Sequence, residues 1–212
     1  MQQPITDFEK HFEIYTQCID ITIDWNEKIK EYEAFKIETP QNIKDSIKRL
    51  NINSNFLIIT SELATIGMSF NNSDSFLYKM FYIKSIYRIV YETFNFIDDN
   101  GKFIFSEENE KTIEIKEKLK QFRRKYNIEK IGKIRNKIAA HYKEDFSVQM
   151  SIMLEIDFEN TMQMYFDFFQ LKFEISNFVI LDFYTGKVSN EFKEYFKFVE
   201  EELIKIGNNK SS

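Results

Sequence analysis

The sequence predicts an all-α protein, an up-and-down helical bundle with extra helices. Apolar residues recur every three or four positions through most of the chain, which is the spacing of amphipathic helices. Only five glycines and two prolines interrupt 212 residues, and no Gly/Pro-rich linker divides them. Since 43% of the side chains are hydrophobic, a sizeable core can form. We therefore expect one domain over residues 1–212.

The first half of the chain predicts three helical segments in order. The apolar spacing begins at Phe8 and gives a first helix. Pro40, in the first turn, and Thr39, as N-cap, would start a helix pair over about residues 43–70. Residues 76–97 are apolar on nearly every face, as is typical of a central helix.

The second half begins with a turn and continues mainly in helices. Asp-Asp-Asn-Gly at positions 98–101 is a strong turn signal. The expected helices then cover, in order, about residues 107–125, 128–141, 157–184 and 190–206. Between the second and third of these, the alternation of apolar and polar residues over 148–156 favours a short β segment or an extended connection.

A polar stripe interrupts the otherwise apolar helix at 76–97. It consists of Lys84, Arg88 and Glu92, which stand four residues apart. We interpret the stripe as a solvated ladder of ion pairs along one helix face. The alternative is that it points into a functional cavity.

The charge distribution is uneven. Although the net charge is −5, residues 116–143 carry eleven basic side chains against two acidic ones. Such a run is commonly a solvated helix face, but here it encloses the most chemically suggestive residues of the chain. We therefore expect a phosphate-bearing ligand there.

Several function classes lack their sequence signatures. The glycines are too far apart for a P-loop or a dinucleotide-binding loop, so we expect no nucleotide cofactor. Two histidines and Cys18 are not clustered, so we expect no metal site. Neither a signal peptide nor an apolar run of about 20 residues is found, which predicts a cytoplasmic protein with no membrane partner.

The candidate chemistry lies in Arg135-Asn136 followed, after four residues, by His141. On an ideal helix Arg135 and His141 would be about 120° apart around the axis and about 9 Å apart along it. Both can contact one phosphate only if the helix ends or distorts before His141, or if a second subunit completes the site.

This motif resembles the HEPN superfamily, in particular its abortive-infection and toxin-like branches. The resemblance implies a homodimer that cleaves RNA without metal by attack of the ribose 2′-hydroxyl, in toxin–antitoxin or antiviral defence. His141 would transfer protons, Arg135 would stabilise phosphate charge and Asn136 would position groups. The expected RNA-binding residues are Arg123, Arg124, Lys133, Lys137 and Lys143. The residues that could line the cleft are Arg88, Glu92 and Tyr142. An antitoxin or regulatory protein would be a further partner.

The sequence also leaves other interpretations open. Related HEPN toxins often carry a tyrosine two positions after the histidine, whereas here Tyr142 follows His141 directly and Lys143 takes the later position. The resemblance therefore gives little support for control by tyrosine modification. Arg135 and Asn136 could be surface residues near a helix end, with His141 contacting terminal carbonyls. The alternative function is a noncatalytic HEPN-like module that binds a nucleotide or a protein partner.

Overall fold

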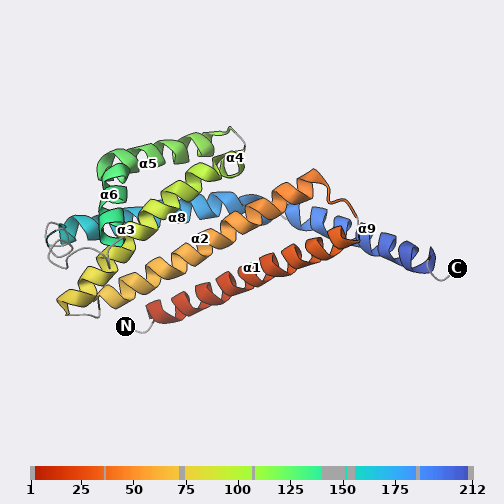
Figure 1. The fold of residues 1–212 in the computed structure, drawn as a ribbon, viewed down its shortest axis with the longest axis horizontal. Coiled ribbons are helices and arrows are strands. Elements are labelled where there is room, and N and C mark those ends of the chain that lie inside the picture. Colours follow the sequence, from red (N-terminus) through yellow and green to blue (C-terminus); the bar gives the residue numbers. More distant parts are fainter. Residues whose placement is uncertain are drawn as a thin grey trace. The chain divides into compact units, whose positions relative to one another are not determined.

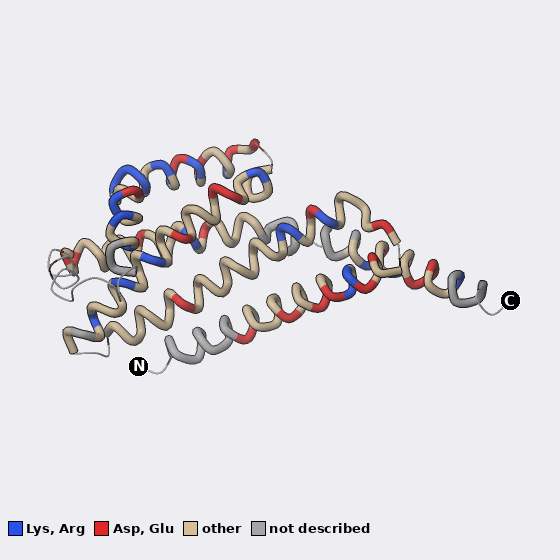
Figure 2. Tube along the Cα trace, in the orientation of Figure 1, with Lys and Arg blue, Asp and Glu red and all other residues tan. Residues whose placement is uncertain are grey.

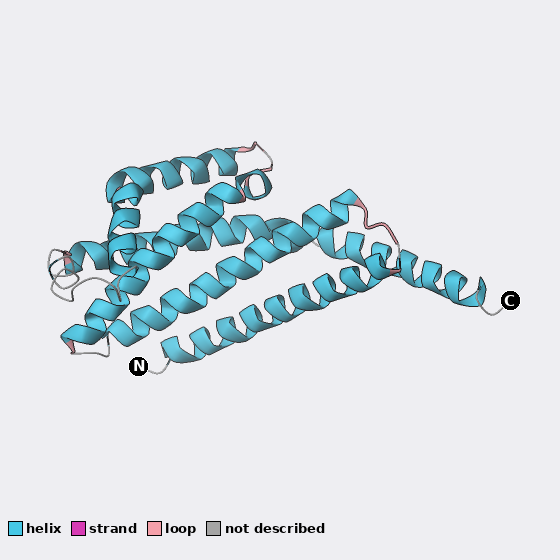
Figure 3. Cartoon of the chain, viewed as in Figure 1, coloured by secondary structure: helices cyan, strands magenta, loops and turns pink. Residues whose placement is uncertain are grey.

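The computed structural model describes residues 3–35, 37–71, 75–106, 108–139, 151, 156–184 and 187–209. Within these ranges the regular structure consists of eight helices and no strand, which confirms the all-α prediction (Figure 3). The expected β segment at 148–156 lies mostly outside the described residues. No helix in the described ranges is long and apolar enough to cross a membrane.

The chain divides into two compact units. Unit 1 comprises residues 1–57 and 177–212, and unit 2 comprises residues 58–176. Both boundaries fall within continuous helices, so the expectation of one domain stays a prediction. Figure 1 shows the helices with their labels.

Unit 1 gathers α1 (Gln3–Ala34), the first part of α2 (Gln41–Asn71), the end of α8 (Phe158–Tyr184) and α9 (Lys187–Asn209). Its core is one cluster of aliphatic and aromatic side chains contributed by α1, α2 and α9: Ile29, Tyr32, Ile43, Ile47, Leu50, Phe192, Tyr195 and Val199. Trp25 packs on the edge of this cluster, with its ring centroid 4.1 Å from that of Phe192. Aromatic packing therefore joins the two ends of the sequence within unit 1.

The expected helix pair over 43–70 is wrong, because α2 is a single continuous helix. Polar residues at its middle are hydrogen-bonded to α1. The Ser54 hydroxyl donates to Thr22 Oγ1 over 2.9 Å, and Asn26 Nδ2 donates to Asn51 Oδ1 over 2.9 Å. Since the hydrogen bonds of these polar side chains are satisfied by α1, the residues can be accommodated within α2 without breaking the helix.

The start of α2 also differs from the prediction by one residue. The helix begins at Gln41, and the Pro40 carbonyl accepts the first backbone hydrogen bond from Lys44. Thr39, expected as the N-cap, is buried instead between α1 and α9. Its hydroxyl accepts from Tyr195 at 3.1 Å and donates to Glu33 at 3.3 Å.

Unit 2 holds α3 (Phe76–Asp99), α4 (Gly101–Ile104), α5 (Glu110–Tyr126) and α6 (Ile128–Ala139), with residues 58–71 of α2 and 158–176 of α8. A stacked aromatic group at its centre joins α3, α5 and α8. The Phe122 ring centroid is 5.3 Å from that of Phe94 and 5.9 Å from that of Phe168. Among the described side chains of α3, Phe94 and six further apolar residues are buried, whereas Phe76, Tyr78 and Phe81 near its start are exposed. The expectation of a central helix over 76–97 therefore holds for one face of α3 and not for its exposed start.

A tight corner between α5 and α6 positions the basic residues of unit 2. Asn127 adopts a left-handed conformation, with φ 48°, that ends α5. Its side-chain oxygen then accepts from the backbone N–H of Lys130 at 3.1 Å and caps α6. Figure 2 shows Lys and Arg gathered where α5 meets α6, and α6 packs against α3.

Candidate nucleic-acid interface

Arg135 links α6 to the central helix α3. Its Nη2 lies 2.7 Å from Glu92 Oε1, and its Nη1 donates to Asn136 Oδ1 at 3.0 Å. Its Nε is buried and has no hydrogen-bond partner among the described residues. The predicted Arg135 and Asn136 are thus held together, with Glu92 as their fixed neighbour.

The third motif residue cannot be placed beside them. His141 lies outside the described residues, as do Tyr142 and Lys143, and the side chain of Lys137 is also not described. The distortion of α6, or the second subunit, that would bring His141 to Arg135 therefore stays a prediction.

The polar stripe on α3 serves contacts between helices. Glu92 pairs with Arg135 on α6, whereas Arg88 pairs with Glu62 on α2, at 3.8 Å. The ladder interpretation was wrong for these two residues, because each meets an opposite charge on another helix. Of the expected cleft-lining residues that the structure describes, Arg88 and Glu92, only Glu92 contacts the motif.

A groove of about 760 Å³ opens between α3, α5 and α6, and we call it the Asn136 groove. Its lining residues are Tyr91, Asn95, Arg123, Arg124, Asn127, Ile128, Glu129, Gly132, Lys133 and Asn136. Four of these were expected from the sequence as RNA-binding or motif residues: Arg123, Arg124, Lys133 and Asn136. The corner at Asn127 brings them together from two helices.

The cations of the groove differ in what they contact. Arg123 donates to Asp98 at 2.5 Å, and its guanidinium lies 4.9 Å from the centre of the Phe94 ring. Arg124 and Lys133 are exposed and have no acidic partner within the described part of the chain, so we call them the unpaired cations of the groove. They are free to neutralise phosphates, whereas binding through Arg123 would compete with Asp98.

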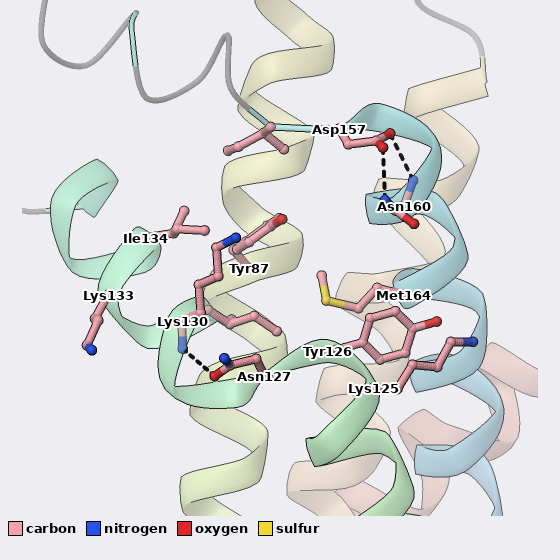
Figure 4. Close-up of a pocket in the computed structure, with 12 residues that line it drawn as sticks. Tyr87, Lys125, Tyr126, Asn127, Lys130, Lys133, Ile134, Asp157, Asn160 and Met164 are labelled. Atoms are coloured by element: carbon pink, nitrogen blue, oxygen red, sulfur yellow. Dashed lines mark hydrogen bonds between the residues drawn. The ribbon is translucent and has the colours of Figure 1, made fainter.

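A second cavity, of about 720 Å³, lies on the other face of α6 (Figure 4). Its floor is apolar and includes Ile131, Ile134 and Met164. Figure 4 shows Lys130 directed into this cavity, whereas Lys133 extends away from it. Lys133 borders both hollows, but its charge is directed to the outside of this one.

The sequence interpretation missed several residues of the Asn136 groove. Tyr91 and Asn95 come from α3, and Gly132 comes from α6. Their signal was present but weak, because Tyr91 and Asn95 stand four residues apart and flank Glu92. Gly132 belongs to no glycine-rich motif, so only its neighbours in space reveal its role.

Comparisons with protein-family models, with curated protein sequences and with solved structures find no match for this chain. Among the described residues, no three His, Cys, Asp or Glu side chains form a group that could hold a metal ion. A function must therefore be inferred from the geometry of Arg135 and of the Asn136 groove.

Proposed function

We propose that this protein is a metal-independent RNA endonuclease of the HEPN type, acting in toxin or antiviral defence in the cytoplasm. The observation that carries the proposal is the position of Asn136, which contacts Arg135 and lines a groove with the unpaired cations Arg124 and Lys133. Asn136 thus connects the Arg135 guanidinium with a groove that carries further positive charge. Such an arrangement suits a phosphodiester substrate, whose phosphates bind to cations.

The proposed reaction is attack of a ribose 2′-hydroxyl on the adjacent phosphorus. The new P–O2′ bond forms a 2′,3′-cyclic phosphate, and the bond from phosphorus to the 5′ oxygen breaks. His141 exchanges protons with the 2′-hydroxyl or the leaving 5′ oxygen. Arg135 stabilises the negative charge that builds up on the phosphate. DNA lacks the attacking hydroxyl, which restricts the substrate to RNA.

The surroundings of Arg135 support a role in binding phosphate. Glu92 holds the guanidinium in place but is half exposed, so a phosphate can compete with it at low cost. The buried Nε has no hydrogen-bond partner among the described residues. This favours a guanidinium that changes partners when substrate binds.

The separation expected between Arg135 and His141 on a helix favours completion of the site by a second subunit. We therefore propose a homodimer in which the motifs of the two subunits meet at the interface and His141 of one subunit faces Arg135 of the other. An antitoxin or regulatory protein would control access to this site.

Cleavage of a labelled structured RNA by the purified protein in excess EDTA tests the proposal. We expect products with cyclic phosphate ends, loss of cleavage in His141→Ala and normal cleavage in the matched control His11→Ala. Cleavage that persists in His141→Ala contradicts the proposal. Tight RNA binding without cleavage would favour the noncatalytic binding module.

A further inference from the structure

The ring of Tyr91 packs directly on the backbone of α6. A Cβ atom added at Gly132 would come within 3.0 Å of three atoms of this ring. Real Cβ atoms do not approach so closely, so the ring occupies space that any other residue at 132 would need. Glycine at 132 thus fixes an aromatic ring in the wall of the Asn136 groove.

Carboxamides are a second feature of the Asn136 groove. Asn95, Asn127 and Asn136 line the same groove, each from a different part of unit 2. The oxygens of Asn127 and Asn136 already accept from Lys130 N–H and from Arg135, which fixes the orientation of both amides. Their NH₂ groups therefore remain to donate to ring nitrogens or carbonyl oxygens of a ligand.

The groove thus combines an aromatic ring, amide donors and the unpaired cations Arg124 and Lys133. Aromatic rings with neighbouring cations bind single-stranded nucleic acid, because unpaired bases expose their faces for stacking. A duplex buries those faces and is bound mainly through its backbone. A hollow of about 760 Å³ is also of the size that holds small ligands, and so suits one unstacked nucleotide better than a helix.

We infer that the Asn136 groove takes up an unpaired base of the RNA and that Tyr91 is its stacking residue, with Arg124 and Lys133 on the flanking phosphates. This inference rests on the proposed function for the identity of the polymer. It adds that the substrate must present a single-stranded nucleotide. It also assigns the preference for single-stranded over double-stranded RNA to Tyr91, a residue outside the motif.

Fluorescence anisotropy tests this with a short 2′-O-methyl RNA, the same strand in a duplex, and an abasic chain of equal length. We expect the single strand to bind tightest. Tyr91→Leu should weaken single-strand binding about tenfold, whereas Tyr91→Phe should keep it. Gly132→Ala should weaken it as well, since the methyl group displaces the ring. On the abasic chain, wild type and Tyr91→Leu should bind equally, because no base is left to stack.

The control is Tyr78→Leu, which removes a tyrosine from the same helix that is 62% exposed and lies outside the groove. Its affinity should equal that of wild type, and thermal melting of each variant checks the fold. Unchanged single-strand binding in Tyr91→Leu, or an equal loss on the abasic chain, overturns the inference.

The two proposals fail separately. A 2′-O-methyl strand has no free hydroxyl for attack, so its binding does not depend on catalysis. Cleavage that depends on His141, with no effect of Tyr91→Leu on binding, refutes the inference alone. Absent cleavage with a base-dependent effect of Tyr91 refutes the nuclease and leaves the binding groove in place.

Discussion

The basic residues of α5 and of α6 look alike in the sequence but differ in their surroundings. Those of α5 are largely paired. Lys118 lies 2.6 Å from Glu174, and Lys125 lies 2.7 Å from Asp167, both acids belonging to α8. Among the described side chains of these two helices, four cations have no acidic partner: Lys116 on α5, whose Nζ lies 5.6 Å from the centre of the Phe105 ring, and Arg124, Lys130 and Lys133 at the corner and on α6.

This contrast shows that a run of positive charge overstates the binding surface. The count over residues 116–143 contains two acids, whereas Lys118 and Lys125 pair with acids outside that stretch: Glu114 on α5, and Glu174 and Asp167 on α8, more than 40 residues further along the chain. A cation that is already paired gains less from a phosphate, because it must first give up its carboxylate. Variants of paired and unpaired cations should therefore differ in their effects on RNA.

The largest expected effect is at Arg135, a paired cation that we place in the active site. Arg135→Gln should lower the cleavage rate at least about 100-fold, since it removes the charge that stabilises the transition state. The partner Glu92 is half exposed and can be solvated by water, so the variant should stay folded. Single-turnover cleavage measures the effect, with Lys120→Gln on α5 as the control. A rate within about threefold of wild type would count against a catalytic Arg135.

A third kind of cation is Lys172, which is buried in α8. Burial lowers its pKa to about 7, from an ordinary value near 10.5. Between these values the unfolded chain binds one proton more than the folded chain, so the free energy of unfolding should rise with pH, by at most about 1.4 kcal/mol per unit. Below pH 7 the lysine is charged in both the folded and the unfolded chain, so the full cost of burying its charge lowers the stability.

Lys172→Met tests this dependence. The variant should be more stable than wild type at pH 7, and the difference should shrink as pH approaches 10. Urea unfolding at several pH values measures it. If the free energies of unfolding of the two proteins changed in parallel with pH, the pKa of Lys172 would be the ordinary one.

The unpaired cations of the groove should matter for binding more than for folding. Arg124→Gln and Lys133→Gln should each weaken RNA affinity several-fold and lower the salt dependence of binding by about one counterion. Titrations at several salt concentrations measure both quantities. If neither variant changes the dependence of RNA affinity on salt concentration, the Asn136 groove does not contact phosphates.

The smallest effect is expected at a paired cation of α5. Lys118→Gln breaks an exposed ion pair with Glu114 and a partly exposed one with Glu174, and pairs that remain in contact with water contribute little to stability. The melting temperature should fall by less than about 2 °C, and RNA affinity should not change. A loss of affinity equal to that of Lys133→Gln would remove the distinction between the two helices.

The sequence predicted the helices better than their boundaries and contacts. Apolar spacing located α3, α5, α6, α8 and α9 to within a few residues, because burial of one face determines that spacing. It failed at α2, where it predicted a helix pair in place of one continuous helix. The polar residues Ser54 and Asn51 in the middle of α2 bond to Thr22 and Asn26 on α1, and no local pattern shows such bonds.

The candidate site was predictable only in part. Charge clustering pointed to Arg124 and Lys133, and the motif pointed to Asn136, all of which line one groove. Tyr91 and Gly132 were not predicted, because the spacing of Tyr91 from Asn95 is only a weak signal and a single glycine carries none. Their contact depends on the packing of α6 against α3.

The left-handed residue at the corner of α5 and α6 makes the groove depend on one backbone conformation. Few side chains other than glycine and asparagine adopt a positive φ readily, and of these two only asparagine can also cap the next helix. A β-branched residue at position 127 would therefore alter the direction of α6 while every charged residue stayed in the sequence. Natural variation at this one uncharged position can thus change which side chains meet in the Asn136 groove, and a count of charges would not detect it.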